Sequence, residues 1–188
     1  TGLAWVIVVI LTLAVFGLGP VGLMGVIMGH AFGARVIGLD QFPERLQLAH
    51  DLGAAEVIDI SGVEKPADAV RRLTDGRGAD LAFETSGSAR AHRDLIHSLK
   101  LGGRGAFVGF GAKEPTVNLT EIIGRQLTLM GSFVMPIHYY EDLVRFIIAH
   151  GLSAQFERMV THRFRLEQAP EAFRLFDSGH TGKVIFEW

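Results

Sequence analysis

The residues with the clearest chemical potential are the glycines of a short turn, residues 17 to 22, whose spacing is G-x-G-x-x-G. In such a turn the first glycine allows a tight reversal, the second leaves room for a pyrophosphate, and the third lets a helix pack closely on a strand. Proline suits the first helical position, and the N–H groups and dipole of the helix that follows favour an anion. The turn therefore predicts a phosphate site made of backbone, with Gly17, Gly19, Pro20, Val21 and Gly22 as its members.

One carboxylate, Asp40, has the position that would complete a dinucleotide site. It lies 18 residues after Gly22 and ends an apolar stretch that starts at Arg35. A carboxylate there can accept hydrogen bonds from both hydroxyls of an adenosine ribose and repels a 2′-phosphate, which favours NAD over NADP. Two alternatives stay open. Asp40 could instead cap the next helix, and Arg45 is a cation that could accommodate the phosphate of NADP.

Stretches with strand and helix spacing alternate along the chain, an order typical of a parallel sheet with right-handed crossovers. Strands are expected at residues 5–16, 35–40, 56–59, 80–84, 105–110, 127–132 and 183–186. Helices are expected from residue 20 and at 44–52, 67–74, 93–99, 139–150 and 166–176, with a loop at 111–117. The pattern predicts an α/β, Rossmann-type doubly wound parallel sheet of about six strands, in a single domain over residues 1–188 with residues 1–12 as an unassigned lead-in.

The carboxyl ends of the strands are where open sheets of this class bind ligands, at the point where the strand order switches. Besides the glycine turn and Asp40, this edge is expected to gather Thr85 to Gly87 and Val108 to Gly111.

Composition narrows the class of protein. The 188 residues include no cysteine and carry a formal net charge of -2, which excludes disulfides and thiolate zinc sites and gives no electrostatic footprint for nucleic acid. No Asp, Glu, Lys or Arg precedes Arg35, and such a stretch is long enough for a membrane span. The reversal at Gly17 to Pro20 divides it, however, and it has no basic N-terminal region and no basic flank until Arg35. We expect a cytoplasmic protein with a small-molecule ligand, and neither a membrane nor a nucleic-acid partner.

Catalytic groups are not evident. Hydride transfer needs a substrate oxygen polarised by a metal or a proton donor, but the eight histidines are scattered and form no metal-ligand motif. His138, beside Tyr139 and Tyr140, could mimic an acid–base site, although its place at a helix start favours a surface or packing role. The sequence therefore predicts a chain that holds a cofactor, with no catalytic and no metal-ligating residue of its own.

Several stretches together resemble the cofactor-binding half of the zinc-type medium-chain alcohol dehydrogenases, the group that includes sorbitol and threonine dehydrogenases. The resemblance covers about residues 13–187 and rests on residues 14–22, 36–40, 44–45, 52–54, 83–87, 102–104, 107–109, 161–164, 171–173 and 182–184. It implies Arg45 near the adenosine ribose, Val108 and Gly109 near the nicotinamide carboxamide, Ser132 and Val134 at a strand end, and Lys183 toward the pyrophosphate.

The resemblance also implies a homodimer or homotetramer formed through an edge strand at Leu127 to Phe133. In that family a separate N-terminal domain supplies the zinc ligands, the proton relay and most of the substrate pocket, and this chain does not contain it. We therefore expect an NAD-binding domain of an alcohol or polyol dehydrogenase that is inactive alone, with zinc only in the missing domain. A free-standing module that senses nicotinamide redox state stays open. A zinc-independent quinone or enoyl reductase is a further alternative, but such relatives tend to use NADPH and Asp40 argues against it.

Overall fold

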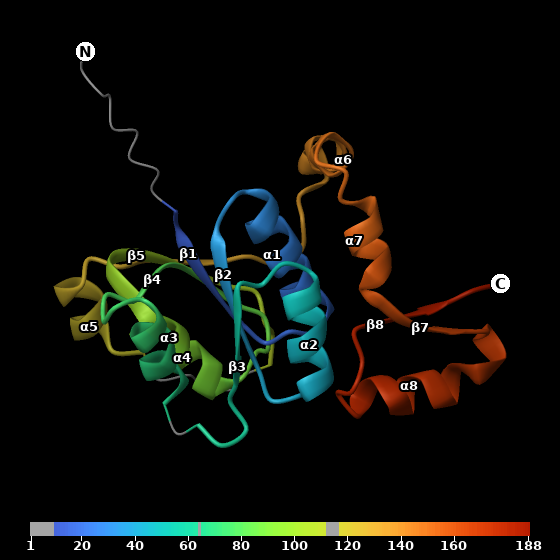
Figure 1. Cartoon of the computed structure of the whole chain (residues 1–188), viewed down its shortest axis with the longest axis horizontal. Helices are drawn as coiled ribbons and strands as arrows, with labels where there is room; N and C mark the ends of the chain where they lie inside the picture. Colours follow the sequence, from blue (N-terminus) through green and yellow to red (C-terminus); the bar gives the residue numbers. More distant parts are fainter. Residues whose placement is uncertain (1–9, 64, 112–116) are drawn as a thin grey trace, which may run out of the picture.

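A six-stranded parallel sheet forms the centre of the protein, in a computed structural model that describes residues 10–63, 65–111 and 117–188. The strand order is β3-β2-β1-β4-β5-β6, and helices cover both faces (Figure 1). The strands are β1 (Thr12–Phe16), β2 (Arg35–Asp40), β3 (Glu56–Asp59), β4 (Ala79–Glu84), β5 (Leu99–Phe107) and β6 (Thr128–Gly131). This is the order of the doubly wound dinucleotide fold, which confirms the predicted Rossmann-type sheet.

Two hydrophobic cores, one on each face of the sheet, hold the helices in place. Successive side chains of a strand point to opposite faces, so Val15 of β1 packs with α1 (Pro20–Ala31) and α2 (Pro43–Asp51). Its neighbours Ala14 and Phe16 pack with α3 (Pro66–Leu73) and α4 (Ala89–Ser98). Since both faces are covered, β1 can be apolar throughout, which accounts for part of the uncharged stretch before Arg35.

The C-terminal part adds smaller elements beside this sheet. They are α5 (Leu119–Gly124), α6 (Tyr140–Ala149), α7 (Ser153–Arg158) and α8 (Ala169–Asp177), with single 3-10 turns at Ile137–Tyr139 and Leu166–Gln168. Strand β7 (Val160–Phe164) pairs in parallel with β8 (Lys183–Phe186) in a separate two-stranded sheet. The expected strand at 183–186 therefore exists but does not extend the central sheet. The sequence analysis did not predict α5, α7 or β7.

Some element boundaries differ from those expected. Strand β1 begins at Thr12, while the described residues Ile10 and Leu11 lie outside it. Residues 5–9 of the expected first strand, most of the lead-in, and residues 112–116 of the expected loop lie outside the described residues. The helix expected at 166–176 is divided between a 3-10 turn and α8.

The largest difference concerns α4 and β5. Helix α4 begins at Ala89 rather than residue 93, because Ser88 caps it and its Oγ accepts a hydrogen bond from the Ala91 N–H at 3.0 Å. Strand β5 begins at Leu99, and its pairing with β4 shifts register before Arg104. Gly102 lies in this irregular part with a φ of +70°. The glycine pair at 102 and 103 therefore marks a bulge within a strand and not the end of the helix.

Strand β6 lies at one edge of the central sheet, where β5 is its neighbour, as expected for an edge strand at 127–133. Among the described residues, no helix has both the length and the apolar character that crossing a bilayer would require.

Candidate functional site

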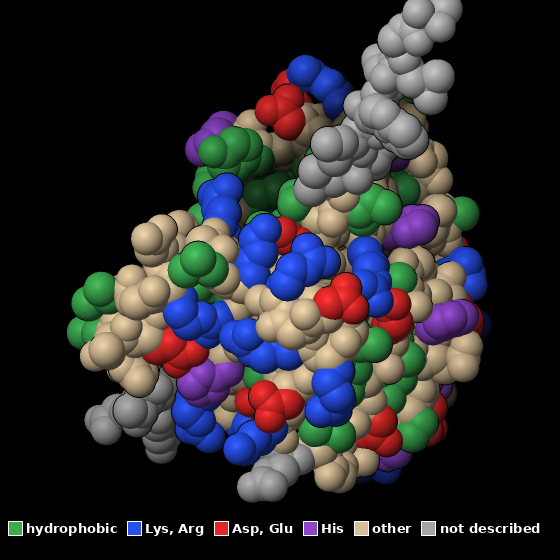
Figure 2. All heavy atoms as spheres, turned by 60° about the vertical axis from the view of Figure 1, so that its left-hand side comes forward, with side chains coloured by type: hydrophobic (Ala, Val, Ile, Leu, Met, Phe, Trp, Pro, Cys, Tyr) green, Lys and Arg blue, Asp and Glu red, His purple; other side chains and the backbone are tan. Residues whose placement is uncertain are grey.

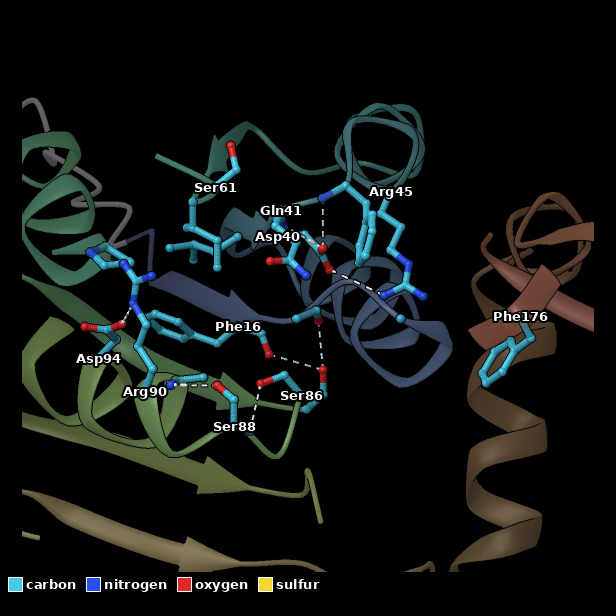
Figure 3. Close-up of a pocket in the computed structure, with 18 residues that line it drawn as sticks. Phe16, Asp40, Gln41, Arg45, Ser61, Ser86, Ser88, Arg90, Asp94 and Phe176 are labelled. Atoms are coloured by element: carbon cyan, nitrogen blue, oxygen red, sulfur yellow. Dashed lines mark hydrogen bonds and ion pairs between the residues drawn. The ribbon is translucent and has the colours of Figure 1, made fainter. Parts of the chain in front are cut away.

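The candidate site is a pocket of about 430 Å³ at the carboxyl ends of β1, β2 and β4 (Figure 3). Strand β1 has β2 on one side and β4 on the other, so this is the place where the strand order reverses and where ligands bind in open α/β sheets. Of the residues expected to bind a cofactor, Gly17, Gly19, Asp40, Arg45 and Thr85 line this pocket.

The three glycines of the turn have different surroundings. Gly17 has a φ of +88°, and a Cβ there would lie 2.9 Å from the Cβ of Ser86. A Cβ on Gly22 would lie 1.8 Å from the carbonyl oxygen of Gly17, so α1 packs against the turn too closely for any side chain. A Cβ on Gly19, by contrast, would meet only Nη1 of Arg45, at 3.9 Å. Gly17 and Gly22 therefore shape the turn, and Gly19 leaves open space in front of it.

The N-terminus of α1 faces that open space. Gly19 is its N-cap and Pro20 its first residue, and no side chain of the described residues caps it. The N–H groups of a first helical turn have no partners within the helix. The N–H groups of Val21 and Gly22 therefore remain available to an external acceptor, and the helix dipole favours an anion there.

Asp40 is buried at the end of β2, and backbone N–H groups surround its carboxylate. Its Oδ2 accepts from the Leu18 N–H at 2.6 Å, and its Oδ1 accepts from the N–H groups of Gln41 at 2.7 Å and Phe42 at 3.1 Å. A carboxylate has about four acceptor positions. Three of these positions are filled, so one remains, on Oδ2, for a hydrogen bond from a ribose hydroxyl. If both hydroxyls of the ribose bind Asp40, they must share an oxygen atom that already accepts a backbone N–H. The N-cap of α2 is Phe42 and has no side-chain cap, so Asp40 does not cap that helix in the way the alternative supposed.

Arg45 lies near Asp40, and its side chain is fixed by contacts with Thr181 and Phe42. Its Nε donates to the carbonyl oxygen of Thr181 at 3.0 Å, and its guanidinium lies 5.0 Å from the centre of the Phe42 ring. Its Nη1 is 3.9 Å from Oδ2 of Asp40. The cation therefore borders the space beside Gly19 in a fixed position, although its anchor, near the C-terminus, is far away in the sequence.

Thr85, directly after β4, links that strand to the glycine turn by hydrogen bonds. Its Oγ1 donates to the carbonyl oxygen of Gly17 at 2.8 Å, and its N–H donates to the carbonyl oxygen of Phe16 at 2.9 Å. Val108 and Gly109 do not line the pocket, but both of their N–H groups donate to the carbonyl oxygen of Glu84, the residue before Thr85.

Lys183 is an expected site residue that lies outside this pocket. It is exposed at the start of β8, its N–H donates to the carbonyl oxygen of Met159 at 2.8 Å, and it is not among the residues that line the pocket. Its role toward a pyrophosphate stays a prediction.

The far end of the pocket holds residues that the sequence analysis missed. Arg90 and Asp94 of α4 lie there, with Nε of Arg90 3.5 Å from Oδ2 of Asp94. Burial raises the pKa of the Asp94 carboxyl, against the opposing effect of Arg90. The other residues missed at this end are Ile60, Ser61, Pro66, Ser88 and Ala91. These residues come from the segment after β3, the start of α3 and the N-terminal part of α4 with its N-cap. Only the fold brings them together, so no sequence motif marks them.

A metal site is a separate question from the dinucleotide pocket. Within residues 10–63, 65–111 and 117–188, no three histidine, aspartate or glutamate side chains are grouped so that they could hold a metal ion. The polar groups of the pocket are those of a binding site: backbone N–H groups, the buried carboxylate of Asp40, the partly buried carboxylate of Asp94, and the two arginines Arg45 and Arg90.

Fold and site together define a Rossmann-type domain with a glycine-rich turn at its switch point. Residues 20–149 match the family model described as zinc-binding dehydrogenase. The chain therefore belongs to the zinc-binding dehydrogenase family, which confirms the resemblance to zinc-type alcohol dehydrogenases.

Individual relatives agree with this assignment. The chain is 33% identical to L-threonine 3-dehydrogenase of Rhizobium rhizogenes over 175 residues, which are 93% of this chain and 50% of that protein. It is 33% identical to sorbitol dehydrogenase 1 of Saccharomyces cerevisiae over 177 residues, 91% of this chain and 49% of that protein. An alcohol dehydrogenase from Thermus sp. ATN1 superposes with a TM-score of 0.82 at 34% identity, covering 93% of this chain and 50% of that one. The chain thus spans about half the length of the curated relatives that it matches.

Proposed function

We propose that the chain is the cofactor-binding domain of an NAD-dependent oxidoreductase that transfers a hydride between an alcohol or polyol and a nicotinamide cofactor, in a cytoplasmic setting. The observation that carries the proposal is the open space at Gly19, in front of an uncapped helix N-terminus and beside the buried carboxylate of Asp40. The names of the relatives, which are alcohol, sorbitol and threonine dehydrogenases, support the substrate class.

In the proposed complex the pyrophosphate lies against the first-turn N–H groups of Val21 and Gly22, with Arg45 as the neighbouring cation. Asp40 accepts a hydrogen bond from the adenosine ribose, and the adenine occupies the end of the pocket near Ile60 and Ala91. The second nucleotide crosses to β4 and β5, the other half of the sheet, where Thr85, Val108 and Gly109 are placed. The bound cofactor would supply hydride transfer, and the residues named here would bind and orient it.

The preference for NAD over NADP rests on Asp40. A 2′-phosphate would meet a carboxylate that is buried, where charge repulsion is stronger than in water. Arg45 opposes this effect only in part, because its Nη1 is 3.9 Å from the same carboxylate and its Nε is already bound to Thr181.

The whole enzyme that we propose has more parts than these 188 residues. The described residues offer no metal-ligand group, and we propose that the zinc, the proton relay and most of the substrate pocket belong to an N-terminal domain outside this chain. Residues 1–188 alone would then bind cofactor without turnover. We further propose that β6, at the edge of the sheet, joins two subunits into a homodimer or a tetramer built from such dimers.

Titration of the chain with NADH and with NADPH, followed by nicotinamide fluorescence, tests the proposal. We expect NADH to bind with a dissociation constant of roughly 1 µM to 1 mM, the usual range for cofactors and substrates, and NADPH to bind at least about tenfold more weakly. Absence of NADH binding, or tighter binding of NADPH, would contradict it. An Arg45→Gln variant serves as a comparison, because it should weaken both cofactors while leaving NADH the tighter of the two.

A further inference from the structure

The side chain of Glu84 is fully buried at the end of β4, beneath the two loops that continue β4 and β5. Its Oε1 accepts three hydrogen bonds, from the N–H and Oγ of Ser86 at 2.7 and 2.6 Å and from the N–H of Gly87 at 2.9 Å. Its main-chain carbonyl accepts from the N–H groups of Val108 and Gly109 at 2.9 and 3.0 Å. Glu84 therefore joins the 85–87 loop to the 108–109 loop.

The second carboxylate oxygen of Glu84 faces a histidine. Its Oε2 lies 3.1 Å from Nε2 of His92, on α4. Both atoms are shielded from solvent, and neither makes a well-directed hydrogen bond within the described part of the chain. The imidazole stands edge-on to the ring of Phe107, with centroids 5.3 Å apart. Because a buried carboxylate oxygen without a donor is costly, the proton on Nε2 of His92 is the one that can satisfy it.

The surroundings of this pair leave little freedom. A Cβ on Gly109 would lie 2.1 Å from the backbone nitrogen of Gly87 and 2.7 Å from Oε2 of Glu84. A Cβ on Gly87 would lie 2.7 Å from the carbonyl oxygen of Phe110. A shift of either loop therefore moves the carboxylate, and a shift of the carboxylate moves both loops.

The charged groups around His92 are mostly engaged with other partners. From β4 it is faced by Glu84, and from β5 by the uncharged ring of Phe107. On the face of the molecule that Figure 2 shows, the Lys and Arg side chains gather on the outer surface. Ion pairs near α4 join Asp94 with Arg90, His97 with Glu121, and Asp80 with Lys100. The Arg71 guanidinium donates to the carbonyl oxygens of His97 and Leu99. The remaining charged residues on these elements are exposed, namely Asp68, Arg72, Arg93 and Arg104. A change in the charge of His92 therefore acts first on Glu84.

We propose that Glu84 and His92 form a proton-linked positioning pair for the second half of the dinucleotide site, an inference that rests on the proposed function. When the imidazole is protonated, it forms a charge-assisted contact with Glu84 and fixes both loops. When it is neutral, a weaker donor faces Oε2 and the loops are held less firmly. Proton uptake by His92 and cofactor binding therefore favour each other, and the coupling is reciprocal.

Calorimetric titration of the chain with NADH tests the coupling. Measured at pH 7 in two buffers of different ionisation enthalpy, it reports the protons taken up on binding. We expect a fractional uptake and an affinity that falls by about fivefold as the pH rises through the range in which histidines lose their charge. His92→Gln keeps a donor but cannot titrate there, so both effects should disappear. His97→Gln, an exposed histidine of the same helix, is the matched control and should behave like the unchanged chain.

Equal proton uptake by the unchanged chain and His92→Gln would overturn the inference. A second measurement needs no variant: the NMR titration of the His92 ring should move to higher pH when NADH saturates the chain, and an unmoved titration overturns the inference as well. Failure of the unchanged chain to bind NADH would overturn the proposed function itself. Binding without coupling would overturn the positioning pair alone.

Discussion

Replacing Gly19 by alanine should separate the stability of the chain from its ability to bind a dinucleotide. Gly19 has φ and ψ of -67° and -176°, an extended conformation that alanine adopts without strain. The added methyl group would find only Nη1 of Arg45, at 3.9 Å. The free energy of unfolding should therefore stay the same or rise by up to about 1 kcal/mol, because alanine restricts the unfolded chain.

The bound cofactor should not tolerate the same change. The methyl group would occupy the space through which the pyrophosphate approaches the N–H groups of Val21 and Gly22, where a hydrogen bond needs about 2.9 Å between heavy atoms. Loss of one hydrogen bond to a charged group costs about 1.5 to 3 kcal/mol. At 1.4 kcal/mol for each factor of ten, NADH should bind roughly 10 to 150 times more weakly.

Thermal unfolding and NADH fluorescence, measured on the same preparations, check both halves of this prediction. Gly124→Ala is the control, because Gly124 lies in α5 and a Cβ there would meet nothing within 4 Å. If Gly19→Ala bound NADH as tightly as the control, the pyrophosphate would not lie at the N-terminus of α1 and the reasoning would fail. If Gly19→Ala unfolded far more easily than the control, the claim that a side chain has open space at position 19 would be contradicted.

Three further changes give different expected outcomes. Gly22→Ala places a Cβ 1.8 Å from the carbonyl oxygen of Gly17, which should cost about 3 kcal/mol and lower the melting temperature by roughly 6 to 12 °C; calorimetry showing an unchanged transition would refute the tight packing. Asp40→Asn should weaken NADH binding and reduce the ratio of NADH affinity to NADPH affinity by about tenfold, since a neutral amide no longer repels a 2′-phosphate; competition titrations that showed an unchanged ratio would mean that another residue sets the preference for NADH. Burial raises the pKa of Asp94, so the stability linked to this carboxyl is present below its unfolded-state pKa and lost as the pH rises through the folded-state pKa. Asp94→Asn should therefore be at least as stable as the unchanged chain at pH 7, with a difference that shrinks toward pH 4; denaturant unfolding that showed the opposite trend would contradict this sign.

The sequence was sufficient for the part of the fold that is locally determined. The glycine turn, the apolar strand before it and Asp40 at the end of β2 lie within one βαβ unit, where spacing alone brings them together. The region around α4 and β5 was less predictable. Gly102 and Gly103 have the composition of a helix stop, and only the pairing with β4 reveals a bulge.

Contacts between distant segments account for what the sequence could not show. The carbonyl of Thr181 anchors Arg45, and β8 pairs with β7 instead of the central sheet; neither follows from local spacing. Asp94 reaches the pocket because α4 turns one face toward it. Glu84 was visible as the end of a strand, but its three donors and its contact with His92 depend on how the 85–87 loop folds back.

The central claim is that a dinucleotide binds with its pyrophosphate at the N-terminus of α1. Backbone amide chemical shifts, recorded by NMR with and without NADH, test it most directly. The account predicts that the amides of Gly19, Val21 and Gly22 shift most, together with that of Leu18, whose N–H is bound to Asp40. Shifts confined to other surfaces, with these amides unmoved at saturating NADH, would contradict it.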